Sequence, residues 1–73
     1  MTESNYLKHL GAKIKKKRED TELSQTELGS KVQLTRMEIY RIEKGKNPTS
    51  IIVLRRMAKV FKMKLSDLVT IED

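Results

Sequence analysis

The chain contains no cysteine and no tryptophan, and His9 is the one histidine among its 73 residues. The lack of cysteine excludes a disulfide framework and a zinc site built from thiolates. A single histidine cannot hold a metal ion by itself, and a serine or threonine nucleophile would lack the partners of a catalytic triad. We therefore expect a protein without enzyme activity, metal or cofactor.

Long hydrophobic runs are also missing. No stretch approaches the roughly 18 apolar residues that a membrane span requires, and no apolar segment follows the N-terminus as in a secretory signal. A chain of 73 residues is at the low end for one hydrophobic core, so we expect a single domain over residues 1–73. The expected compartment is the cytoplasm, with no membrane partner.

The net charge is positive, but both signs are present. Lys and Arg number 16 against 10 Asp and Glu, which gives a formal net charge of +6 and a pI near 9.8. This excess is typical of nucleic-acid-binding proteins, although small soluble domains and cationic membrane-surface helices also show it. Carboxylates are interspersed among the cations, which indicates a folded domain rather than a disordered basic tail.

Few residues in the sequence break helices: there is one proline and there are three glycines. Strand-like alternation is absent as well, so the expected fold class is all-α. A first helix is expected to begin near Ser4 or Asn5 and to end between residues 20 and 22. Its inward face carries Leu7, Leu10 and Ile14. The opposite face carries Lys13, Lys15, Lys16 and Lys17. It is interpreted as solvated, with a non-specific phosphate contact as the alternative.

Two capping boxes mark the next helices. Ser24 with Glu27, and Thr35 with Glu38, have the S/T-x-x-E form in which side chain and backbone cap each other reciprocally. The second helix is expected to run to about residue 31, and the third from residue 35 to residue 44. Gly45 then ends the third helix as a C-terminal glycine does, and the next residues, up to 48, form a loop.

The C-terminal third, residues 50–70, is expected to complete the core. Thr49 or Ser50 is predicted to cap a fourth helix, and Ser66 a short fifth one. Helical spacing predicts a buried stripe along the fourth helix, made of Ile51, Leu54, Met57, Ala58 and Phe61.

The two capped helix starts, Ser24 and Thr35, are close enough in sequence to form a helix-turn-helix over residues 25–44. In that motif the first helix braces the second, which can lie in a DNA major groove. Gly29 is expected at the closest approach of the two helices, where a small residue is required.

The sequence over residues 7–69 resembles the Cro and phage-repressor family of helix-turn-helix proteins. The resemblance is carried by the runs LSQTELG at 23–29, LTR at 34–36, IYRIEKG at 39–45, and the later residues Met57, Ala58, Lys59 and LSDL at 65–68. It implies a compact five-helix, lambda-repressor-like domain of bacterial or phage origin. Such a domain binds double-stranded operator DNA as a homodimer on a two-fold symmetric site, in competition or contact with RNA polymerase.

The resemblance also implies roles for individual residues. Base contacts fall on Arg36, Met37 and Arg41, and Arg18 with Glu43 matches a structural ion pair between the first and third helices. Contacts to the DNA backbone fall on Gln25, Thr35, Tyr40, Lys44, Lys46 and Asn47.

The chain departs from the family pattern at three turns. Glu22, Gln33 and Lys62 stand where the family usually has glycine. If the turn geometry is kept, each needs a positive φ, which non-glycine residues tolerate at a cost of roughly 1 kcal/mol.

An apolar segment near the C-terminus, with Leu68, Val69 and Ile71, is either core or a self-association patch. The hypothesis is an isologous dimer contact through the fifth helix and part of the fourth, with Leu65, Leu68, Val69 and Ile71. The sequence thus predicts a sequence-specific transcription regulator. One alternative is a protein-interaction module on the same fold, binding a toxin or a polymerase subunit through residues 65–71. Another is a nucleic-acid chaperone that binds through charge alone.

Overall fold

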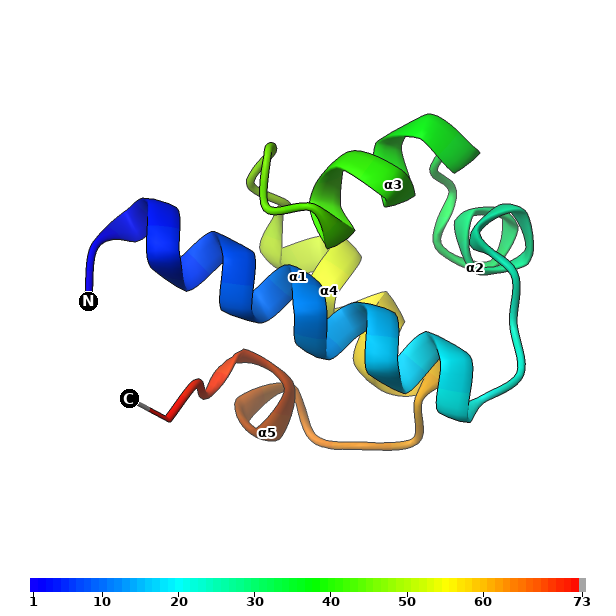
Figure 1. Ribbon diagram of the computed structural model, residues 1–73. Coiled ribbons are helices and arrows are strands. Elements are labelled where there is room, and N and C mark those ends of the chain that lie inside the picture. Colours follow the sequence, from blue (N-terminus) through cyan, green and yellow to red (C-terminus); the bar gives the residue numbers. More distant parts are fainter. Residues whose placement is uncertain (73) are drawn as a thin grey trace.

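The computed structural model describes residues 1–72 and contains five helices (Figure 1). Within those residues there is no strand, so the predicted all-α, five-helix architecture is confirmed. In chain order the helices are α1 (Glu3–Asp20), α2 (Gln25–Val32), α3 (Arg36–Glu43), α4 (Ile51–Val60) and α5 (Leu65–Val69).

One core lies at the centre of the five helices. The long α1 spans the molecule, with α3 against one side of it and α5 against another, while α4 packs on α2 and α5 (Figure 1). Apolar side chains from every helix meet in this core. Its buried members are Leu10, Ile14, Leu28, Val32, Ile39, Ile42, Leu54, Met57, Ala58 and Leu68.

Four of the helices begin at a side-chain cap. The predicted capping boxes at Ser24 and Thr35 are both present, and Ser50 caps α4. The predicted start of α1 at Ser4 or Asn5 was wrong. Thr2 caps this helix instead, because its hydroxyl oxygen accepts from the Asn5 backbone N–H at 3.1 Å.

The C-terminal helix is held at its far end rather than capped at its start. α5 begins after Lys64 with no side-chain cap, so the prediction of Ser66 as its cap was wrong. The Lys13 ammonium donates to the carbonyl oxygens of Asp67 and Thr70, and the Tyr6 hydroxyl donates to that of Val69. Lys13 therefore ties α1 to α5 and is not part of a solvated face.

Burial corrects two further predictions. Ile51 was expected in the core but is 58% exposed. It shares a helix face with Leu54 and Ala58, but as the first residue of α4 it lies beyond the end of the buried stripe. Leu68 was expected at a dimer contact but is fully buried, so it has no surface to offer a partner. The other residues of that expected contact, Leu65, Val69 and Ile71, are half-buried.

The three turns without glycine keep the left-handed conformation. Glu22, Gln33 and Lys62 have φ angles of 61°, 63° and 56°, so the family's turn geometry is kept at all three positions. Gln33 ends α2 in this conformation and lets the chain reverse into α3 within a few residues.

Candidate nucleic-acid interface

The helix-turn-helix is closed by a tight contact at Gly29. A Cβ atom on this residue would lie 2.4 Å from the carbonyl oxygen of Leu34, which is too close for any side chain. The same turn is fastened by the Leu34 backbone N–H, which donates to the Gly29 carbonyl at 2.8 Å. The crossing of α2 and α3 thus depends on glycine at the position that the sequence singled out.

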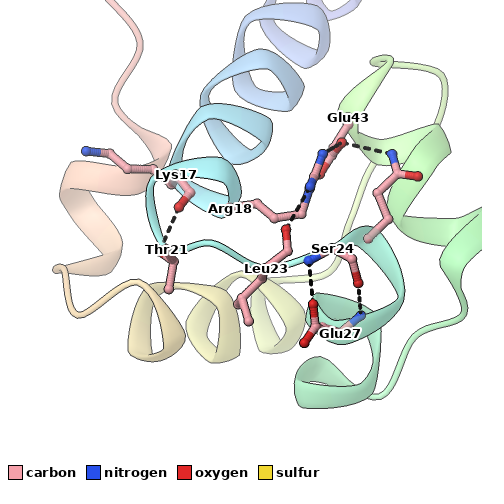
Figure 2. Close-up of polar contacts among 8 residues, drawn as sticks. Lys17, Arg18, Thr21, Leu23, Ser24, Glu27 and Glu43 are labelled. Atoms are coloured by element: carbon pink, nitrogen blue, oxygen red, sulfur yellow. Dashed lines mark hydrogen bonds and ion pairs between the residues drawn. The ribbon is translucent and has the colours of Figure 1, made fainter.

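A buried ion pair joins α1 to α3, as the family resemblance implied (Figure 2). The Nε of Arg18 lies 2.6 Å from Glu43 Oε2, and its Nη2 lies 3.2 Å from Oε1. The two side chains are 11% and 2% exposed. The hydrogen bond to Glu43 raises the pKa of Arg18 above its ordinary value, so the guanidinium is held in the charged form.

Two further hydrogen bonds extend this ion pair. Arg18 also donates to the Leu23 carbonyl at 2.8 Å, and Gln25 Nε2 donates to Glu43 Oε1 at 3.1 Å. The start of α2 is therefore fixed to the ends of α1 and α3 through one carboxylate. Such a network holds the three helices in one relative orientation.

The outer face of α3 is polar and exposed, whereas its inner face is buried. Ile39 and Ile42 point into the core. Arg36 and Arg41 are exposed, and the apolar side chain of Met37 is 49% exposed. The predicted base-contacting residues therefore share the free side of one helix, as a helix that enters a groove requires.

Most of the predicted backbone-contacting residues flank α3, whereas Tyr40 lies within it and Gln25 is the first residue of α2. Thr35 precedes α3, and its hydroxyl accepts from the Glu38 N–H at 3.1 Å. Lys44, Lys46 and Asn47 follow the other end of α3 and are all exposed. Gly45 lies between them with a φ of 73°, so the loop turns sharply at this residue. Gly45 also packs closely on the backbone of Lys8.

A hollow of about 410 Å³ opens between α1, α2 and α3 beside the exposed face of α3. The ammonium of Lys44 lies 5.7 Å from the centre of the Tyr40 ring, within the range of a cation–π contact. Lys15 lines the hollow. From the sequence it was interpreted as part of a solvated face, with a non-specific phosphate contact as the alternative. The lining residues are Ala12, Lys15, Gln25, Arg36, Tyr40, Glu43 and Lys44.

Residues 1–72 contain no cluster of three or more acidic or histidine side chains that could bind a metal. None of the five helices has both the length and the apolar character needed to cross a membrane.

Comparison with known proteins agrees with this geometry. Residues 14–68 match the helix-turn-helix family HTH_3. The chain belongs to this family of DNA-binding transcription regulators. It is 34% identical over 61 residues to the uncharacterized HTH-type transcriptional regulator YgzD of Bacillus subtilis, covering 84% of this chain and 92% of that protein.

Solved structures share the HTH_3 fold at lower sequence identity. The restriction-modification controller protein C.AhdI from Aeromonas hydrophila superposes with a TM-score of 0.79 at 22% identity, over 85% of this chain and 94% of that chain. The clp gene regulator ClgR from Corynebacterium glutamicum superposes with a TM-score of 0.81 at 19% identity, over 88% and 82%. At these identities the two structures establish the fold.

Proposed function

We propose that this protein is a sequence-specific regulator that places α3 in the major groove of a two-fold symmetric operator. The observation that carries the proposal is the free outer face of α3, with Arg36, Met37 and Arg41 exposed above a buried Ile39 and Ile42. The major groove of B-DNA is about 12 Å wide and admits one helix. The three-helix network around Glu43 would hold α3 rigid during docking.

Each outward residue suits a particular base. Arg36 and Arg41 can each form a bidentate pair with guanine, worth about 1–3 kcal/mol of discrimination. Met37 offers a flexible apolar group that suits a thymine methyl. Phosphate contacts from α3, from the residues that flank it and from the start of α2 would fix the register of these residues on the duplex, through Gln25, Thr35, Tyr40, Lys44, Lys46 and Asn47.

We propose a homodimer because one helix-turn-helix reads only half of a symmetric site. The contact would use the half-buried apolar residues Leu65, Val69 and Ile71, which lie at the end of the chain away from α3 in Figure 1. Occupancy of the operator would regulate transcription by excluding or contacting RNA polymerase.

The direct test is selection from a random DNA library at near-physiological salt with excess competitor. Enrichment of a two-fold symmetric motif, with half-sites about one helical turn apart, is the expected result. Sedimentation of the free protein and of its complex then measures the stoichiometry. A monomer on a single half-site would contradict the dimer, and salt-sensitive binding without any enriched motif would contradict base reading.

One observation favours a second candidate function, a protein-interaction module. Ile51 and Ile52 are 58% and 57% exposed, and a shallow cationic hollow on α4 adjoins them, lined by Ile52, Arg55, Arg56 and Lys59. If this surface carries the main function, exchanging Ile52 and Arg55 for serine and glutamate would abolish biological activity while DNA binding persists.

A further inference from the structure

Lys15 lies on the side of α1 that faces the hollow, one helical turn before the buried Arg18. Its neighbour Lys16 does not line the hollow. The Lys16 ammonium lies 3.6 Å from the Asp20 carboxylate one turn further along α1, and its side chain is 77% exposed. Two adjacent lysines of one helix thus have different surroundings.

The electrostatics of the hollow favour an anion. Its floor holds the Glu43 carboxylate, but the Arg18 guanidinium pairs with that charge. Three further cations line the walls of the hollow. Arg36 and Lys44 lie at the two ends of α3, and Lys15 lies on α1.

The hydrogen-bond donors are arranged for an anion as well. The Gln25 amide nitrogen donates one hydrogen to Glu43 at 3.1 Å, and an amide nitrogen carries a second. Gln25 is also the first residue of α2, so the positive end of the helix dipole lies at the rim of the hollow. The ring of Tyr40 holds the Lys44 ammonium nearby.

The position of the hollow selects the kind of anion. It is recessed between three helices beside the outward face of α3, so a base edge deep in a groove cannot enter it when α3 is docked. A phosphate group stands out from the duplex and can enter. The hollow has a volume of about 410 Å³, which accommodates one phosphate with bridging waters.

We infer that Lys15 of α1 binds a phosphate of the DNA backbone in this hollow, together with Gln25 and Lys44. This inference rests on the proposed function, and it extends the DNA-contacting surface from the helix-turn-helix to the first helix. Because a phosphate contact carries no sequence information, Lys15 contributes affinity and register but no base preference.

Salt titration of full-length variants tests the inference. Lys15→Gln should weaken binding to the selected operator and to a duplex of unrelated sequence by the same factor. The slope of log K against log salt should become shallower by about 0.9, one phosphate contact. Between about 50 and 200 mM salt the variant should therefore lose about threefold less affinity than the wild type. Lys15→Arg should retain the wild-type slope.

Lys16→Gln is the matched control, since it removes the same charge one residue away. Equal changes in slope for the two variants would overturn the inference, because they would show only a general effect of net charge. No change for Lys15→Gln would overturn it too. Circular dichroism verifies that each variant is folded, and both substitutions are on exposed side chains.

A phosphate-neutralisation scan identifies the partner atom. Each operator phosphate near the half-site is replaced in turn by an uncharged methylphosphonate. One position should weaken the wild type more than Lys15→Gln, in which Gln25 and Lys44 still contact that phosphate, while all other positions weaken both equally. If every position weakens both proteins equally, Lys15 has no single phosphate partner and the inference fails. The scan differs from the test of base reading, which fails when the wild type does not distinguish the operator from the unrelated duplex.

Discussion

At the scale of the single residue, the ion pair of Arg18 and Glu43 has a large expected effect on stability. The pair is nearly buried, with side chains 11% and 2% exposed. Arg18→Met would leave the Glu43 carboxylate buried without its counter-charge, which costs about 3–5 kcal/mol of unfolding free energy. Urea denaturation followed by circular dichroism measures this loss.

The double variant Arg18→Met with Glu43→Leu is the control for this prediction. It removes both charges and should recover most of the stability, because no unpaired charge remains. A single variant within about 1 kcal/mol of the wild type would show that the pair is solvated and that the three-helix network is weak.

Gly29 sets the separation of α2 and α3. Gly29→Ala would place a methyl group 2.4 Å from the Leu34 carbonyl oxygen, so the helices must move apart or tilt. We expect a loss of about 1–3 kcal/mol from this overpacking, measured by thermal unfolding. Ser30→Ala, at the exposed neighbouring position, should leave the midpoint nearly unchanged. If Gly29→Ala and Ser30→Ala have the same thermal unfolding midpoint, the contact between residue 29 and the Leu34 carbonyl is not tight.

At the scale of the helices, the two capping boxes make stability depend on pH. Backbone hydrogen bonds from Ser24 and Thr35 lower the pKa of Glu27 and Glu38 below their ordinary value of 4.5. The folded state therefore binds their protons less readily than the unfolded state does. This contribution to stability is complete above the ordinary pKa and is lost as the pH falls through the lowered values.

The double variant Glu27→Gln with Glu38→Gln isolates this effect, because glutamine keeps the capping hydrogen bond without a titrating group. The wild-type melting temperature should fall further than that of the variant between about pH 7 and about pH 3. If the melting temperatures of the wild type and the variant fall by the same amount over that pH range, protonation of Glu27 and Glu38 does not affect stability. Glu3→Gln, on another helix, serves as the control.

The left-handed turns are a second property at the scale of the helices. Gln33 has a φ of 63°, a conformation that costs a side chain about 1–2 kcal/mol, whereas glycine adopts it freely at some cost in unfolded-state entropy. Gln33→Gly should therefore raise the unfolding free energy by about 0.5–1 kcal/mol, measured with urea. Ser30→Gly, inside α2, should lower it by about 0.5 kcal/mol.

Helix starts could be predicted where the signal is local. Ser24 and Thr35 each have a glutamate three residues later, and both boxes formed. Thr2 and Ser66 show the limit of this reasoning. Thr2, Ser4 and Asn5 all stand near the start of α1, whereas Ser66 lies inside α5, which begins after Lys64. Where each helix begins depends on how α1 and α5 pack on the rest of the molecule.

Side-chain environments were harder to predict than helices. Helical spacing places Ile51 with Leu54, but only the position of α4 on its neighbours decides which of them is buried. The hollow at Lys15 brings together residues from three helices, so its sequence signal is no stronger than that of Lys16. The Arg18–Glu43 pair was available only through the family resemblance, since the two residues are distant along the chain.

At the scale of the whole molecule, a net charge of +6 attracts DNA of any sequence. An experiment must therefore distinguish recognition of bases from binding through net charge alone. The most direct measurement compares binding to the selected operator and to an unrelated duplex for Arg36→Ala and Arg41→Ala. Arg55→Ala, on the exposed side of α4, is the control of equal charge.

Our account predicts that the operator preference falls about five- to 150-fold in each α3 variant, equivalent to about 1–3 kcal/mol. The preference should survive in Arg55→Ala. If all three variants weaken both duplexes by the same factor, α3 does not read bases and the protein binds DNA through charge alone, which would contradict the proposed function.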